Sequence, residues 1–226
     1  MKITFLGTGA ADWPTEKPKE TAEFRRLSSA LIDGVLLIDP GPQVLEALNE
    51  LGIDPGQIQY IINTHRHSDH FCIETLEALK SFGAVFVECF ADDKKRIGNY
   101  NILALKGNHA TCEDTVHFII SAQGKNLFYG LDGAWLLYDE VKAIQENKPD
   151  LAVFDATIGY IDGDYRIFEH NNLNMVLEMK KTLDPYIGRF CISHMARTLH
   201  PGHKVLSENM HKHDIITAYD GLTLEI

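Results

Sequence analysis

The sequence predicts an α/β fold in which two packed β-sheets carry helices on their outer faces, an αββα sandwich. Short apolar runs alternate with amphipathic segments from one end to the other, in two halves of similar pattern. No Pro/Ser-rich linker or low-complexity tract separates them. A chain of 226 residues with 45% hydrophobic content is long enough for one compact core. We therefore expect residues 1–226 to form a single domain.

Twelve short apolar runs predict the β-strands, because each is bounded by Gly, Pro, Asp or Asn. Asp33-Gly34 lies between two of these runs and is a strong hairpin signal, since both central residues of such a turn favour positive φ. The expected strands are 2–6, 28–33, 35–39, 58–62, 84–88, 102–106, 115–121, 125–130, 151–155, 188–192, 214–218 and 222–225.

Five segments have apolar residues three and four positions apart and predict helices. The clearest apolar face is formed by Leu173, Val176, Leu177 and Leu183, and Pro185 ends that helix. The expected helices are 42–51, 73–82, 139–147, 171–184 and 202–212.

The composition restricts the classes of partner. A formal net charge of −11 is poorly suited to binding a polyanion, because nucleic-acid binding relies on clustered Lys and Arg. No run of eighteen apolar residues suggests a membrane span, and the first residues indicate a strand rather than a signal peptide. Four cysteines without a CxxC pair suggest reduced thiols. We expect a cytoplasmic protein that acts on a small molecule.

Several predicted strands end at a residue that can bind a metal. The carboxyl ends of strands that meet at one edge of a sheet would bring such side chains together. These residues are Asp39, His65, Asp132, Asp155 and His194.

The densest group of candidate ligands is the HxHxDH motif of residues 65–70. His65 and His67 project the same way from extended backbone and suit one ion, whereas Asp69 and His70 follow a turn and suit a second. Three histidines and an aspartate crowded together have no good packing role, because without a metal they incur desolvation and like-charge penalties. Nitrogen and oxygen donors without thiolate favour zinc, manganese or iron.

The motif after a strand, with LLIDPG upstream, resembles the metallo-β-lactamase superfamily. Later segments extend the resemblance over the whole chain: His109 in LKGNHA, Asp132 in YGLDGA and His194 in CISHMA. The resemblance implies two divalent ions, Zn²⁺ or Mn²⁺ with Fe as a further option, bridged by a water or hydroxide that attacks the substrate. It places one ion on His65, His67, His109 and Asp132, and the other on Asp69, His70, Asp132 and His194.

Two further residues bear on this ligand set. His117 is the rival of His109, but it lies inside a predicted strand, where a core or surface histidine is more common. The resemblance suggests that Asp39 is a carboxylate that holds the outer nitrogen of a ligand histidine.

His170 and Asp155 indicate a phosphodiesterase. They resemble the non-ligand histidine and its carboxylate partner in the branch that contains the phosphoribosyl 1,2-cyclic phosphate phosphodiesterase and ribonuclease Z. His170 would donate a proton to the leaving oxygen while Asp155 orients its ring. We count Asp69 with these two as catalytic residues. The expected substrate is a small phosphodiester, with cyclic phosphodiesters included.

Other functions stay open. A ribonuclease Z would need a protruding basic arm to hold tRNA, and none is visible in the sequence. Lactonases and thioesterases share the metal site but have less need of His170, and a metal-dependent sensor without turnover is the non-enzyme alternative. A homodimer is compatible with the sequence. The roles of several polar residues near these motifs are also open: Arg25, Arg26, Ser28, Ser29, Arg197, His200 and His203.

Overall fold

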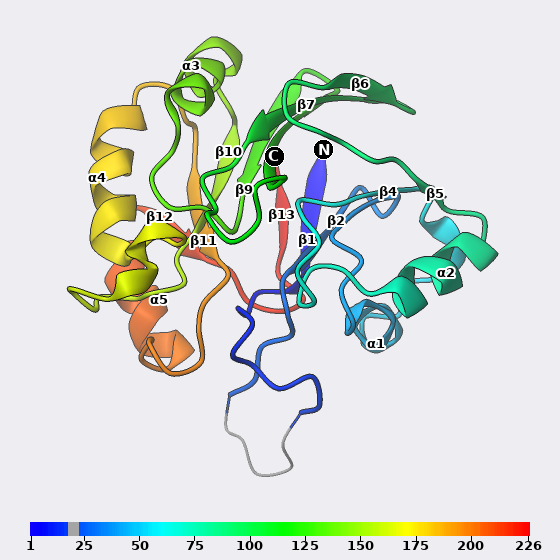
Figure 1. Ribbon diagram of the computed structural model, residues 1–226, viewed down its shortest axis with the longest axis horizontal. Coiled ribbons are helices and arrows are strands. Elements are labelled where there is room, and N and C mark those ends of the chain that lie inside the picture. The colour runs from blue at the N-terminus through cyan, green and yellow to red at the C-terminus, as the bar shows by residue number, and fades with distance from the viewer. Residues whose placement is uncertain (18–22) are drawn as a thin grey trace.

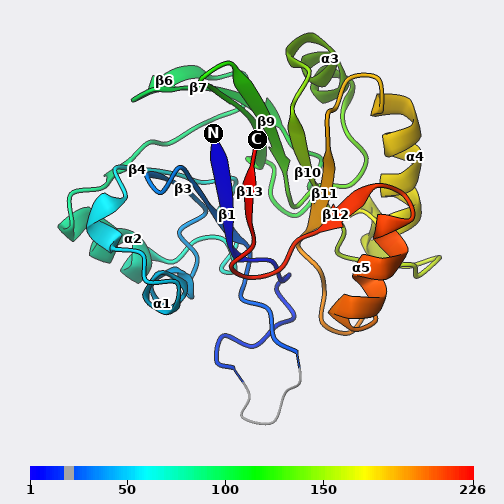
Figure 2. The same ribbon diagram turned by 180° about the vertical axis from the view of Figure 1, so that it is seen from behind.

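The computed structural model describes residues 1–17 and 23–226 and arranges them as two mixed β-sheets packed against each other (Figure 1). Helices α1 and α2 lie beyond one sheet, and α3, α4 and α5 lie beyond the other (Figures 1 and 2). This is the αββα arrangement that the sequence predicts.

The first sheet combines antiparallel and parallel pairing. Strands β13, β1, β2 and β3 pair antiparallel, and β3, β4 and β5 pair parallel. In spatial order the strands are β13 (Thr223–Glu225), β1 (Lys2–Gly7), β2 (Ser29–Ile32), β3 (Leu36–Ile38), β4 (Tyr60–Ile62) and β5 (Val85–Phe86). Its outer face is covered by α1 (Val44–Glu50) and α2 (Ile73–Ser81).

The second sheet is parallel on one side and antiparallel on the other. In spatial order its strands are β12 (Ile215–Thr217), β11 (Phe190–Ser193), β10 (Leu151–Asp155), β9 (Lys125–Gly130), β8 (Val116–Ala122), β7 (Tyr100–Lys106) and β6 (Lys94–Ile97). Strands β9 to β12 pair parallel, and β6 to β9 pair antiparallel. Its outer helices are α3 (Tyr138–Asn147), α4 (Leu173–Leu183) and α5 (His203–His211), and two 3₁₀ turns are η1 (Pro55–Gln57) and η2 (Tyr165–Phe168).

The alternation of side chains along each strand separates the core between the sheets from the cores under the helices. On β3, Leu36 and Ile38 belong to the cluster between the sheets, whereas Leu37 packs under α1 and α2. On β9, Leu127 and Tyr129 face the first sheet while Phe128 packs under the outer helices. A strand buried on both faces is therefore apolar at consecutive positions.

The structure contains all twelve predicted strands and all five predicted helices, with ends shifted by at most two residues. It also contains β6, which the sequence pattern missed. The strand reads Lys-Lys-Arg-Ile and lies at the edge of its sheet, paired only with β7 among the described residues. Charged residues on an edge strand discourage pairing with another chain, and they also remove the apolar signal. No described helix is both long and apolar enough to cross a membrane.

The parallel strands place their carboxyl ends on a common side of the sandwich. In the first sheet β3 and β4 run in register, Ile38 beside Ile62, and in the second Asp155 at the end of β10 lies beside Ser193 of β11. The loops that follow these strands carry most of the candidate site residues.

The hairpin between β2 and β3 gives a first prediction. Asp33 and Gly34 both have positive φ, 51° and 76°, and a Cβ on Gly34 would meet nothing within 4 Å. Gly34→Ala should therefore lower the free energy of unfolding by about 1 kcal/mol through backbone conformation alone. Urea denaturation measures this loss. Gly56→Ala is the control, because that glycine has no positive φ and its nearest contact is the side chain of Asp54; equal losses in the two variants would contradict the assignment.

Candidate metal centre

Loops from both sheets bring the predicted ligands together. The segment between β4 and α2 supplies four of them, and single residues follow β7, β9 and β11. All but His67 are buried, and His67 is partly buried. The residues brought together are His65, His67, Asp69, His70, His109, Asp132 and His194.

Three strands end in residues with left-handed backbone. Asp39, Asp132 and His194 have φ of 61°, 55° and 61°, each directly or nearly directly after its strand. This conformation is uncommon outside glycine and costs energy, so surrounding contacts must fix it. The Asp39 N–H donates to Ile62 O at 3.0 Å, and the Asp132 N–H donates to Asp155 Oδ2 at 3.2 Å. The sharp turns direct the side chains towards one another rather than along the strands.

The first group of candidate ligands consists of His65, His67 and His109, whose donor atoms lie within 4.8 Å of one another. His109 Nε2 is 3.2 Å from His67 Nδ1, and Asp132 Oδ1 is 4.0 Å from His109 Nε2. This is the set that the resemblance implies for the first ion.

The second group consists of Asp69, His70 and His194, again within 4.8 Å. His70 Nε2 and His194 Nε2 are 3.2 Å apart, and Asp69 Oδ2 lies 3.5 Å and 3.6 Å from them. Asp132 Oδ2 lies 2.6 Å from His70 Nε2 and 3.0 Å from His194 Nε2. Asp132 therefore faces both groups, one oxygen towards each, as a bridging carboxylate would.

The polar atoms at the centre are better placed to bind divalent ions than to form hydrogen bonds with one another. Asp132 Oδ2 approaches two imidazoles closely, yet it accepts no hydrogen bond of acceptable geometry, and buried His65 Nε2 has no partner either. Leaving a buried polar atom unpaired costs about 1–3 kcal/mol. Lone pairs that converge without hydrogen bonds are the arrangement that a metal site requires.

The outer nitrogens of the histidines are held by surrounding groups. Asp39 Oδ2 is 2.8 Å from His70 Nδ1, which confirms the contact predicted for this carboxylate. His109 Nδ1 donates to the carbonyl of Glu169 at 3.2 Å, and Thr157 Oγ1 lies 2.7 Å from His194 Nδ1. These contacts leave the Nε2 atoms facing the centre.

The electrostatics of the centre favour added positive charge. Burial, with the nearby charge of His70, lowers the pKa of His65 to about 2, so His65 is a neutral ligand. Burial acts to lower the pKa of His194, but Asp132 and other carboxylates outweigh it and raise the pKa to about 10. Burial acts to raise the pKa of Asp69, but His70 and His194 lower it to about 2. The carboxylates therefore stay ionised and favour a protonated, positively charged imidazole beside them. Divalent ions would supply the same compensating positive charge.

His170 lies at the edge of this cluster and is paired with Asp155. His170 Nδ1 is 2.9 Å from Asp155 Oδ2, while its Nε2 has no hydrogen bond within the described chain. Burial acts to lower the pKa of His170, but the charge and hydrogen bond of Asp155 raise it above its usual value. The structure thus contains the pair that the sequence suggested. His170 Nδ1 is also 3.7 Å from Asp132 Oδ1, so the pair adjoins the candidate ligands.

Asp155 has more partners than the sequence indicated. Besides His170 and Asp132, it accepts hydrogen bonds from Thr157 N at 2.9 Å and Asn171 N at 3.1 Å. Sequence analysis missed Thr157, whose hydroxyl lies near both Asp155 and His194. Its position two residues after the strand-ending Asp155 was the available signal.

His117 lies outside the ligand groups. It is 1% exposed and bonded to Glu140 and to the carbonyl of Leu131, as a core histidine. Among the described residues, the alternative of His117 as the third histidine of the first group finds no geometric support.

Several of the polar residues whose roles the sequence left open are largely committed to the fold. Arg25 Nη1 donates to Thr8 Oγ1 and to Ala218 O, and Arg26 forms an ion pair with Glu50. The Ser28 and Ser29 hydroxyls donate to main-chain carbonyls.

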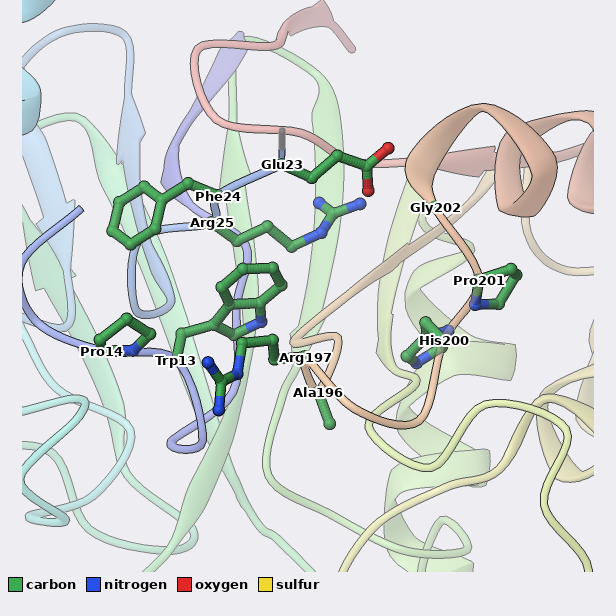
Figure 3. A pocket seen from close by; sticks show the side chains of 10 residues that line it. All are labelled: Trp13, Pro14, Glu23, Phe24, Arg25, Ala196, Arg197, His200, Pro201 and Gly202. Carbon is green, nitrogen blue, oxygen red and sulfur yellow. The ribbon is translucent and has the colours of Figure 1, made fainter. Parts of the chain in front are cut away.

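A cavity of about 360 Å³ lies between the segment after β1 and the segment after β11 (Figure 3). Arg197 and His200 line it together with Trp13, whose Nε1 donates to the carbonyl of Met195 at 2.8 Å. His203 does not line this cavity, and its Nδ1 lies 3.0 Å from Arg25 Nη2. The lining residues Ala196 and Arg197 follow His194 closely in the sequence, but none of the candidate ligands lines the cavity. No sequence motif pointed to Trp13.

Comparison with known proteins agrees with this geometry. Residues 27–72 match the model of the metallo-β-lactamase superfamily. An uncharacterized protein of Methanocaldococcus jannaschii is 36% identical over 72 residues, which are 31% of this chain and 26% of that protein, so the match spans about a quarter of the relative's length.

Solved structures resemble the whole chain. Zn²⁺-bound PqqB from Methylobacterium extorquens aligns with a TM-score of 0.76 and 17% identity over 100% of both chains. A diphosphatase from the PhnP family aligns with a TM-score of 0.72 and 18% identity over 100% of this chain and 97% of its own. The short form of human tRNase Z aligns with a TM-score of 0.69 and 18% identity over 100% and 99%.

These structures share the fold, and the matched segment ends just beyond the HxHxDH motif. The cluster of histidines and aspartates lies where the loops of that fold converge. The chain has the metallo-β-lactamase fold, its residues 27–72 match the model of the metallo-β-lactamase superfamily, and its cluster of histidines and aspartates could hold metal ions.

Proposed function

We propose that this chain is a dinuclear metal-dependent phosphodiesterase that acts on small phosphodiesters, cyclic phosphates included, with His170 as the general acid. The observation that carries the proposal is the His170–Asp155 pair at the edge of the candidate metal centre. A hydrolase that only had to expel a good leaving group would not need a protonated imidazole there.

The candidate ligands divide between two ions in the way the donor groups suggest. His65, His67 and His109 would hold one ion, Asp69, His70 and His194 would hold the other, and Asp132 would face both. Two divalent ions would lower the pKa of the attacking water and stabilise charge on the phosphate oxygens.

His170 supplies what the metal ligands do not. Because Asp155 occupies its Nδ1, the ring is oriented and its charged form is favoured, which leaves Nε2–H to donate. The polar atoms of the buried candidate ligands either face the centre, where a metal would bind them, or form hydrogen bonds with groups around it. Among the described residues, His170 lies beside the centre but outside the two groups of candidate ligands, so its imidazole can move a proton to a leaving oxygen.

The substrate is expected to be small. The chain has a net charge of −11, and Arg25 and Arg26 are turned inward. A surface of this kind disfavours polyanions such as tRNA. Ribonuclease Z activity is the second candidate, favoured by the fold it shares with tRNase Z.

The metal content of the purified protein is the first test. We expect two divalent ions per chain by elemental analysis after dialysis. Asp132→Ala should lower the occupancy of both sites, because its two oxygens face different ligand groups. Asp184→Ala, at the end of α4, is the control and should keep both ions. A single ion in the wild type, or full occupancy in Asp132→Ala, would rule out a shared carboxylate.

Removal of His170 tests the general acid. His170→Ala should slow hydrolysis of alkyl or ribose diesters by about 10²–10⁴-fold. Bis(p-nitrophenyl) phosphate should be affected least, because p-nitrophenolate leaves without a proton. Steady-state rates on both classes measure the difference, with metal content determined in the same samples.

His213→Ala is the matched control, because that histidine is exposed beyond the end of α5. It should change neither the rates nor the metal content. The assignment is wrong if His170→Ala removes an ion or slows all diesters equally.

Substrate size gives another prediction. The enzyme should hydrolyse small diesters and leave precursor tRNA largely intact at physiological salt, because the acidic surface repels the polyanion. Parallel assays with a cyclic nucleotide, a cyclic ribose phosphate and a precursor tRNA measure this preference. Efficient and specific removal of a tRNA 3′ trailer would favour the ribonuclease Z candidate instead.

A further inference from the structure

A buried imidazole–carboxylate pair lies behind the candidate metal centre and is not used by the proposed function. His117 on β8 and Glu140 in the first turn of α3 are each 1% exposed. His117 Nδ1 is 2.5 Å from Glu140 Oε1. Such a pair is costly to bury, so it needs a compensating role.

Both nitrogens of His117 face acceptors. Nε2 lies 3.0 Å from the carbonyl oxygen of Leu131, which can only accept, so Nε2 carries hydrogen. Nδ1 faces the carboxylate of Glu140. Burial acts to lower the pKa of His117, but the charge and hydrogen bond of Glu140 raise it above the usual value. Both ring nitrogens therefore face acceptors, an arrangement that favours hydrogen on each of them.

Three glycines leave room for this ring. A Cβ on Gly133 would lie 2.5 Å from His117 Cε1, and Cβ atoms on Gly107 and Gly130 would lie 3.0 Å from Nε2 and 3.3 Å from Nδ1. The backbone on both sides of Asp132 is thus packed directly against the imidazole. A side chain at Gly133 would displace either the ring or the loop.

The peptide group between Leu131 and Asp132 is held at both ends. His117 donates to its carbonyl oxygen at 3.0 Å, and its N–H donates to Asp155 Oδ2 at 3.2 Å. The residue that follows this peptide group, Asp132, has a φ of 55°, which an L residue adopts only when its surroundings fix it. The direction of the Asp132 carboxylate depends on that conformation.

The second oxygen of Glu140 extends the connection. It accepts a hydrogen bond from Leu137 N at 2.7 Å, at the start of α3. Hydrogen bonds therefore connect Leu131 to His117 and His117 to Glu140 in α3. They join the two ends of the segment that runs from Asp132 to α3.

We propose that His117, held by Glu140, is a positioning residue that fixes the Leu131–Asp132 peptide and so aims the Asp132 carboxylate between the two ligand groups. This inference rests on the proposed metal centre. It assigns to His117 an effect on metal affinity without contact with a metal.

The test uses the paired variant His117→Leu/Glu140→Gln. Removing His117 alone leaves a buried unpaired carboxylate and can prevent folding. The paired variant removes both charges and keeps an acceptor for Leu137 N. We expect two ions still to bind at saturation, but with dissociation constants raised about 10–100-fold, the usual loss when a group that orients a ligand is removed. Competition with a chromophoric chelator measures Zn²⁺ affinity.

Two further variants separate positioning from stability. His117→Gln keeps one donor in reach of Leu131 O and should lose less affinity than the paired variant. Leu183→Ala removes a buried side chain from the core under the outer helices, contacts no candidate ligand through a hydrogen bond, and should lower the melting temperature without changing affinity. The visible absorption spectrum of the Co²⁺-loaded proteins should change in the paired variant and not in Leu183→Ala.

Each outcome has one reading. Weaker binding of both ions with a changed Co²⁺ spectrum, beyond any effect of Leu183→Ala, supports the positioning role. Wild-type affinity and spectrum in the paired variant and in His117→Gln would overturn it while leaving the metal centre intact. A wild-type protein that binds no pair of ions would overturn the proposed function and this inference together.

Discussion

The centre depends on one carboxylate, Asp132, whose two oxygens face different groups of histidines. Its neighbours cannot satisfy it: Oδ2 lies close to two imidazoles without a hydrogen bond of good geometry. The surrounding structure nevertheless holds it in a left-handed turn through contacts on both sides of one peptide group. The fold thus holds a buried carboxylate oxygen where it accepts no hydrogen bond, at a cost in free energy. This is expected of a side chain whose partner is a cation.

The sequence predicted the elements well because most strands are buried on both faces and most helices show one apolar face. It predicted that these histidines and aspartates lie close together because they follow strands that end on the same side of the sandwich. The sequence pattern missed strand β6 because a strand at the edge of a sheet can carry charged residues. Its Lys-Lys-Arg stretch has no alternation of apolar and polar residues. Arg25 and Arg26 were also hard to interpret, since their partners, Ala218 and Glu50, lie 193 and 24 residues away in the sequence.

The contacts around the ligands were only partly predictable. Asp39 could be suggested from its motif, and the structure places it on His70. His117 could be set aside as a core residue from its strand, but nothing local showed that its ring would meet Leu131 or Glu140, fourteen and twenty-three residues away. Hydrogen bonds of this range depend on how β8, β9 and α3 pack, and no short motif encodes them.

Asp155 contacts the proposed general acid and also the groups that fix the geometry of the site. One of its oxygens lies within hydrogen-bonding range of His170 Nδ1, Thr157 Oγ1 and the Asp132 N–H, and 3.4 Å from His194 Nδ1. The same carboxylate therefore lies close to the proposed acid, the turn at Asp132 and a candidate ligand. A change at Asp155 would disturb all three, so loss of activity there could not be assigned to the acid alone. Substitution of His170, which contacts Asp155 through Nδ1, tests the proposed proton transfer separately. Substitution of His117 tests the turn at Asp132 separately, because His117 contacts the same peptide group from its opposite side.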